Sequence, residues 1–309
     1  MNANIERANA VRTAAPRRRR MPVEQVVINL FFILLSIVVL VPLLLVVSIS
    51  ITDEQSLLAS GYHLFPKKID WLAYEVILKS PGQMLRAYGV TVTVTVVGTI
   101  VGLLLTAMIA FSISRRDYRY RRITTLYVFF TMLFSGGLVP FYILVTQYLH
   151  LKDTIWALII PYLLNPFYVL IMKGFLEKLP HEVFESAKID GSSEWRIFFS
   201  MVLPLSTPAL ATVGLFIAFV YWNDWWLGLL FIDAPNLVPL QLLLYRIMNT
   251  MEFLINNIDR VNVAIDLSAF PNLSARMAMA VLAAGPMMLV FPFFQRYFVA
   301  GLTVGSVKS

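Results

Sequence analysis

The sequence predicts an all-α integral membrane protein with six transmembrane helices. Hydrophobic residues make up 59% of the 309 residues and charged residues only 14%, whereas a water-soluble domain carries about 25% charged residues. Six apolar segments are long enough to cross a bilayer, which takes about 20 helical residues. Lys and Arg flank these segments and do not interrupt their centres. This pattern is typical of a membrane bundle.

All six spans are expected to be helical, because a bilayer offers no partners for the unpaired backbone groups of an open sheet. The first apolar segment is too long for a signal peptide and has no clear cleavage site, so we expect it to be retained. The spans form one transmembrane domain over 25–299, and cover residues 25–51, 86–113, 123–147, 154–174, 206–232 and 277–299.

The positive charges predict the orientation of this bundle. With the N-terminus inside, 17 of the 25 Lys and Arg fall in inner segments, and such a bias marks the cytoplasmic side. We therefore expect a basic tail (1–24) and a short C-terminal tail (300–309) in the cytoplasm, and the segments 52–85 and 233–276 outside. The basic clusters are not interleaved with aromatic residues, so nucleic acid is not an expected partner.

Catalysis and metal binding find little support in the sequence. The chain has no Cys, and His63, His150 and His181 are too scattered for a metal site. A membrane enzyme would need converging acids and bases, but only His181, Glu182 and Glu185 lie together, on one short segment. No span centre carries a charge, which argues against an ion-coupled transporter. The energy for any transport would have to come from elsewhere.

The polar loop 175–205 lies between the fourth and fifth spans, is expected in the cytoplasm, and is large for a simple connection. Pro180 suits the start of a helix, because its missing N–H would have no partner there. The pattern predicts a short helix over 181–189. Gly191 ends this helix, because Gly readily takes the left-handed conformation found just past a helix end.

A second helix is predicted over 193–203, with Asp190 or Ser192 as its capping residue. Pro204 then bends the chain into the fifth span. Physical chemistry alone leaves two interpretations open. The helix pair is either a surface connection between spans or a surface that contacts a partner.

The spacing of residues in this loop resembles the EAA loop of ABC-importer permeases. Glu185-Ser186-Ala187 is followed after three residues by Gly191, and after nine more by Met201-Val202-Leu203-Pro204. The family pattern is E-A-A, three residues, G, nine residues, I-x-L-P. Only Ser186 and Met201 depart from it, and both changes are conservative.

Three further segments resemble carbohydrate-uptake permeases of the MalG-like group: 134–140, which is most like the LplC-type branch, 221–223 and 295–303. The resemblance implies the type I ABC importer permease fold and a sugar-transporting subunit of the bacterial cytoplasmic membrane. The EAA loop by itself fits equally a permease for a non-sugar solute, such as a peptide or an amino acid. A membrane scaffold, in contrast, would not co-purify with an ATPase.

The resemblance also implies partners. These are a second homologous permease, two ABC ATPase subunits that bind ATP and Mg²⁺, and an extracytoplasmic solute-binding protein that docks on the outer segments. The chain itself is expected to bind no cofactor. In the family the helix before the EAA glycine enters a groove of the ATPase, which assigns this coupling role to Glu185, Ala187, Asp190 and Gly191. The C-terminal tail is expected near the same interface.

A substrate pathway is predicted where polar or helix-breaking residues fall inside spans. Gly136 and Gly137 mark either a broken helix that lines a cavity or a site of close helix packing. Asn165 must find a partner or face the pathway.

Near the outer end of the fifth span, aromatic and polar residues follow one another. This cluster is either an aromatic belt or a platform for a sugar, and it consists of Tyr221, Trp222, Asn223 and Asp224. In the related group the partner permease makes most of the sugar contacts. Lys67, Lys68, Arg246 and Arg260 would allow an acidic oligosaccharide as cargo.

Overall fold

The computed structural model describes residues 23–256 and 271–306, and within these ranges it contains helices and no β-strand. The all-α prediction is confirmed. Predictions about most of the basic tail, about Arg260 and about the last three residues lie outside the described ranges.

Three long helices are apolar enough to cross a membrane without a break. They correspond to the first, second and sixth predicted spans. They are α2 (Val23–Ser50), α5 (Pro81–Ser114) and α17 (Asn272–Ser306), the last passing this test over Asn272–Pro292.

The third and fourth predicted spans are bent pairs of shorter helices, and a further bent pair joins the end of the predicted loop to the fifth span. The first joins α6 (Arg121–Leu133) to α7 (Leu138–Ile143) and the π-helix η1 (Leu144–Tyr148) at 111°. The second joins α8 (Trp156–Ile159) and η2 (Ile160–Tyr162) to α9 (Pro166–Leu176) at 50°. The third joins α11 (Glu194–Ile197), the π-helix η3 (Phe198–Val202) and α12 (Leu203–Leu205) to α13 (Thr207–Trp222) at 83°.

The breaks have local causes. Gly137 has a φ of +85°, which favours glycine and turns the chain between α6 and α7. Pro166 lacks an N–H and so begins α9. The continuous helices predicted over 123–147 and 154–174 are therefore interrupted. The helix predicted over 206–232 ends at Trp222, and the short helix α14 (Trp226–Phe231) follows it.

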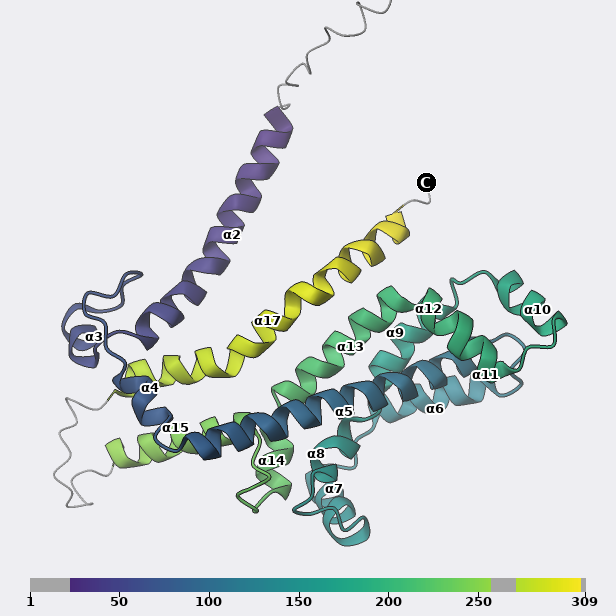
Figure 1. The fold of residues 1–309 in the computed structure, drawn as a ribbon. Helices are drawn as coiled ribbons and strands as arrows, with labels where there is room; N and C mark the ends of the chain where they lie inside the picture. Colours follow the sequence, from purple (N-terminus) through teal and green to yellow (C-terminus); the bar gives the residue numbers. More distant parts are fainter. Residues whose placement is uncertain (1–22, 257–270, 307–309) are drawn as a thin grey trace, which may run out of the picture.

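The bundle is organised around α5 (Figure 1). It packs along α13 and α9. The small helices α3 (Glu54–Ser60) and α4 (Leu72–Ile77) lie at one end of the molecule, with α15 (Leu240–Asn256) close by, and α10 (His181–Ile189) lies at the other. The first helix, α2, leans away from the bundle, and only its last turn, Ser48 to Ser50, is buried.

Two glycines let α5 approach its neighbours closely. A Cβ at Gly98 would lie 2.5 Å from the ring of Tyr221 in α13. A Cβ at Gly102 would lie 2.9 Å from the carbonyl oxygen of Leu163, inside the break between η2 and α9. Since both distances are below normal van der Waals contact, these positions accept no side chain without a shift of α5 or its neighbours.

The beginning of α17 is fixed by a side chain from α3. The Glu54 carboxylate is buried and accepts hydrogen bonds from the backbone N–H groups of Leu273 (2.9 Å) and Ser274 (3.0 Å) and from the Ser274 hydroxyl (2.8 Å). A negative charge is favourable at a helix N-terminus, where N–H groups have no intrahelical partners. Glu54 therefore joins α3 to the first turn of α17.

We expect Glu54→Gln to lower the stability of the bundle by about 1.5–3 kcal/mol. The neutral amide loses the negative charge, and its NH2 group would face the N–H and O–H donors of Leu273 and Ser274. The measurement is the thermal unfolding temperature in detergent. Glu75→Gln, at an exposed position of α4, is the matched control. Equal unfolding temperatures for the two variants would contradict the assignment.

Candidate functional site

The helix α10 begins and ends where the loop sequence predicts. It covers His181–Ile189, and Gly191 follows with a φ of +76°. The N–H of Gly191 donates to the Lys188 carbonyl and the N–H of Ser192 donates to the Ala187 carbonyl, both at 3.0 Å. These two bonds form a Schellman motif, which satisfies the last carbonyls of the helix. The turn after α10 is therefore held in one conformation.

The capping of the next helix differs from the prediction. Ser193 is the cap, and its hydroxyl accepts a hydrogen bond from the N–H of Arg196 at 3.4 Å. The prediction of Asp190 or Ser192 was wrong, because both residues belong to the turn that closes α10. The regular α-helix after this cap is also short, since α11 passes into the π-helix η3.

The two faces of α10 have different environments. Glu185, Asp190 and Gly191 are exposed, as expected for residues that meet a partner. Phe184 and Ala187 are buried against the bundle. The prediction that Ala187 belongs to the docking tip is therefore not supported, because this residue is 2% exposed and packs inside this chain.

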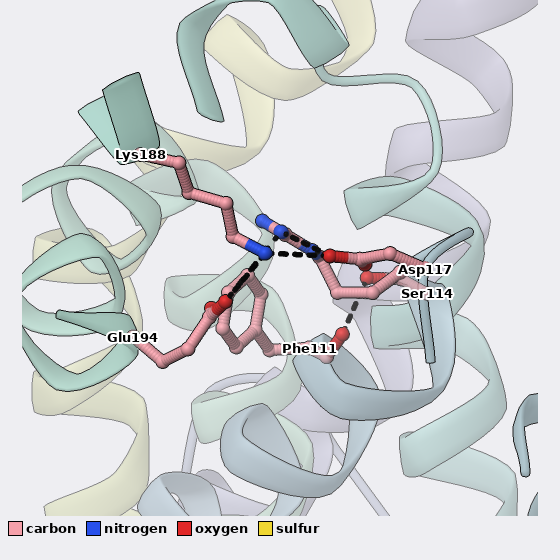
Figure 2. Close-up of polar contacts among 6 residues, drawn as sticks. Phe111, Ser114, Asp117, Lys188 and Glu194 are labelled. Atoms are coloured by element: carbon pink, nitrogen blue, oxygen red, sulfur yellow. Dashed lines mark hydrogen bonds and ion pairs between the residues drawn. The ribbon is translucent and has the colours of Figure 1, made fainter. Parts of the chain in front are cut away.

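A cluster of four charges ties α10 to the end of α5 (Figure 2). The Nζ atom of Lys188 lies 2.6 Å from Asp117 Oδ2 and 2.7 Å from Glu194 Oε1. The guanidinium of Arg115 donates to both carboxylate oxygens of Asp117, each at 3.0 Å. Sequence reasoning missed this cluster, because it took Arg115 only as an orientation signal and could not place Lys188 beside it.

The cluster is also stable electrostatically. Hydrogen bonds from Arg115 and then Lys188 hold the pKa of Asp117 well below its usual range, and the partner carboxylates raise the pKa of Arg115 and Lys188. A lowered carboxyl pKa contributes stability at every pH above the unfolded value and loses it only as the pH falls toward the folded value. The charge of Asp117 is therefore retained between about pH 5 and about pH 8.

An aromatic layer lies beneath the charges. The Phe111 ring of α5 lies 6.3 Å from Phe184 of α10 and 5.7 Å from Phe198 of η3, and all three are buried. The guanidinium carbon of Arg115 lies 5.5 Å from the centroids of both Phe111 and Phe184. Cation–π attraction of this kind strengthens where water is excluded.

The glycines predicted to mark the pathway lie in the break between α6 and α7. Gly136 and Gly137 are exposed, and among the described residues no atom lies within 4 Å of a Cβ built at Gly137. Close packing within this chain therefore does not explain them. Their place in the chain is that of a broken helix.

Asn165 lies at the second break and finds a local partner. Its Oδ1 accepts a hydrogen bond from the N–H of Phe167 at 2.9 Å and so caps α9. The residue is exposed and lines a cavity of about 290 Å³ together with Tyr162 and Tyr168. The partner predicted for Asn165 is therefore present, and its place on the substrate pathway stays a prediction.

Tyr221 and Trp222 are structural residues. Both are buried, at 2% and 4% exposure. The Tyr221 hydroxyl donates to the Ile159 carbonyl, and Trp222 Nε1 donates to the Ala283 carbonyl, both at 2.8 Å. Neither the aromatic belt nor the sugar platform describes these two side chains.

Missing backbone donors explain why two carbonyls, those of Ile159 and Leu282, accept side-chain hydrogen bonds. The N–H of Leu163 donates to Ile160, which leaves the Ile159 carbonyl for Tyr221. In α17, Pro286 has no N–H for the Leu282 carbonyl, and the Tyr88 hydroxyl donates to that oxygen at 2.7 Å. Inside a membrane such groups must be satisfied by protein.

The two polar residues after Trp222 end α13 and begin α14. Asn223 is exposed, and its Nδ2 donates to the Phe219 carbonyl at 2.9 Å. Asp224 accepts a hydrogen bond from the Tyr162 hydroxyl at 3.1 Å and one from the N–H of Leu227 at 3.4 Å. The four residues 221–224 therefore point to different neighbours and do not form one ligand surface.

The architecture and the loop geometry agree with a comparison to known families. The family described as binding-protein-dependent transport system inner membrane component matches residues 98–304. The chain belongs to this family. It is accordingly an ABC-importer permease subunit in the inner membrane, a transport component and not an enzyme. Family membership implies an ATPase and a solute-binding protein as partners.

Individual relatives cover nearly the whole chain. Protein LplC of Bacillus subtilis is 38% identical, over 88% of this chain and 90% of its own length. The polygalacturonan/rhamnogalacturonan transport system permease protein YtcP of the same organism is 36% identical, over 90% and 96%. A bacterial ABC transporter involved in the import of the acidic polysaccharide alginate matches in structure with a TM-score of 0.74 and 25% identity, over 89% of this chain and 96% of the matched chain.

For this permease subunit, we expect Tyr221→Phe to cost about 1–3 kcal/mol of stability, because the Ile159 carbonyl loses its donor. The apparent KM for cargo should stay unchanged, since the ring is buried. Unfolding temperature and uptake kinetics measure the two effects separately. Tyr148→Phe, at an exposed site, is the control. A raised KM with unchanged stability would favour the sugar platform.

Proposed function

We propose that this chain is a membrane-spanning subunit of an ATP-driven importer of oligosaccharides, and that it is driven through the exposed face of α10. The observation that carries the proposal is the helix itself. It projects at one end of the bundle, ends in a fixed Gly191 turn, and exposes Glu185 and Asp190. These are three of the four positions that the family pattern assigns to ATPase contact.

The sugar cargo is supported by the names of the relatives. YtcP is named for polygalacturonan and rhamnogalacturonan, and a further relative, AraQ of Bacillus subtilis, for arabinooligosaccharides, with 26% identity over 93% of this chain and 96% of its own length. A peptide or amino acid cargo finds no such support. The basic residues predicted to favour an acidic cargo add little, because Lys68 lies 3.2 Å from Asp53 and Arg246 donates to the Ile232 carbonyl.

The proposal includes a defined assembly. A second homologous permease completes the pore, and two ATPase subunits hold ATP and Mg²⁺ beneath α10. A solute-binding protein docks at the end formed by α3, α4 and α15. The complex lies in the inner membrane of a bacterial cell. Both termini of this chain are in the cytoplasm, as the distribution of Lys and Arg favours. The bare apolar sides of α2 fit lipid and a neighbouring permease.

The substrate pathway is proposed to follow the helix breaks. Broken helices line cavities in transport proteins, because freed backbone groups need polar surroundings. Gly136, Gly137 and Asn165 lie at two such breaks, and Asn165 lines the 290 Å³ cavity. Tyr221 and Trp222 support the wall of this pathway from behind.

The test is reconstitution of the full complex in proteoliposomes with a labelled oligosaccharide identified by screening the solute-binding protein. We expect uptake only with ATP, both ATPase subunits and the binding protein present. The chain has no native cysteine, so Glu185→Cys provides a unique site for cross-linking to an ATPase cysteine. Uptake without the ATPases, or labelling of Glu185→Cys from outside intact cells, would overturn the proposal.

A further inference from the structure

We propose that the four-charge cluster makes α10 and α5 one rigid unit, so that the motion of the ATPases enters the membrane through α5. The proposal rests on the proposed docking of α10. It assigns Asp117 and Lys188 as positioning residues that act through α5 and need no contact with cargo or nucleotide.

The first support is the pattern of ion pairs. Lys188 of α10 lies between two carboxylates, Asp117 just after α5 and Glu194 at the start of α11. Arg115 holds Asp117 from the other side with two hydrogen bonds of 3.0 Å. Arg115 directly follows the last residue of α5. A displacement of Lys188 is therefore transmitted to that helix through two charge-assisted contacts, Lys188 to Asp117 and Asp117 to Arg115.

The second support is the layer below the charges. Phe111, in the last turn of α5, packs against Phe184 of α10 and Phe198 of η3. The Arg115 side chain is 12% exposed and lies over the first two rings. Packed interiors move as units and do not deform continuously. The connection between α10 and α5 is therefore both polar and apolar.

The third support is the weakness of the alternative route. From α10 to α13 the chain passes through the four residues of α11, the π-helix η3, the three residues of α12 and an 83° bend. Irregular helix and sharp bends absorb displacement in hinge motions. A push on α10 is therefore transmitted less directly along the chain than across the cluster.

The fourth support is the position of α5 inside the bundle. Gly102 lies 12 residues before Ser114, about 18 Å along the helix. It contacts the Leu163 carbonyl within the break before α9, and Gly98 contacts the ring of Tyr221, which bonds to Ile159 before the same break. A displacement of α5 is thus delivered at the break where the 290 Å³ cavity lies.

The test uses the complete reconstituted complex with Asp117→Asn or Lys188→Met. We expect cargo uptake per ATP hydrolysed to fall about tenfold, a typical size for coupling between sites, while Glu185→Cys still cross-links to the ATPase. Asp117→Glu and Lys188→Arg, which keep the charges, should stay close to the wild type. Lys178→Met removes an exposed lysine of the same loop outside the cluster and should have no effect.

A distance measurement decides the question without relying on activity. Spin labels at Glu182→Cys on α10 and Val101→Cys on α5 should give one narrow distance that is the same with and without trapped nucleotide. The distribution should broaden in Lys188→Met. A wild-type distance that changes with nucleotide, or normal uptake per ATP in both charge-removing variants, would overturn the rigid unit. Failure of the wild-type cross-link would instead overturn the docking of α10.

Discussion

Gly191→Trp is expected to abolish uptake while the chain still inserts and assembles. With φ at +76°, a side chain there costs roughly 1–2 kcal/mol of backbone strain. Within this chain the space is open, because no described atom lies within 4 Å of a Cβ at this position. The indole would therefore project from the tip of α10 toward the partner, and prevent docking without damaging the bundle.

Two smaller replacements separate strain from bulk. Asn tolerates the left-handed conformation, so Gly191→Asn should retain most of the uptake, and Gly191→Ala should fall between Asn and Trp. The measurements are uptake by the reconstituted complex and cross-linking of α10 to the ATPase. Uptake that survives the Trp replacement would show that the α10 tip does not meet the ATPase.

A side chain at Gly98 is expected to prevent correct packing of the bundle. A Cβ would lie 2.5 Å from the Tyr221 ring. That ring has little room to yield, because it is 2% exposed and its hydroxyl is bonded to Ile159. Overpacking of this kind costs about 1–3 kcal/mol or more. We expect Gly98→Leu to give little folded protein in a detergent size-exclusion profile.

The matched control is Gly89→Ala in the same helix. No described atom lies within 4 Å of a Cβ there, and Ala favours helix over Gly by about 1 kcal/mol. This variant should be as stable as the wild type or more so. A normal elution profile for Gly98→Leu would mean that α5 and α13 are further apart than the structure places them.

Local sequence rules were sufficient for α10. A proline before the helix, a glycine after it and a short amphipathic pattern give the bounds His181–Ile189 and the turn at Gly191. These features depend on neighbours in sequence, so the sequence contains them. The same holds for the number of apolar segments, since length and hydropathy set the requirement for crossing a bilayer.

The contacts that give residues their roles could not be predicted in this way. Asp117 and Lys188 are 71 positions apart, and Tyr221 meets Ile159 across 62. An aromatic residue near a span end looks like an interfacial anchor until the break in the neighbouring helix is known. Ala187 likewise shares a motif with exposed residues, but helix periodicity turns it inward.

The uncovered sides of α2 have a practical consequence for handling this protein. A subunit without its partners, once extracted from lipid, exposes more than a dozen large apolar side chains along α2. An exposed apolar surface of this extent promotes aggregation. Yield in the laboratory should thus rise when companion subunits are co-expressed. In the cell, the same exposed apolar surface would direct unassembled subunits to proteolysis.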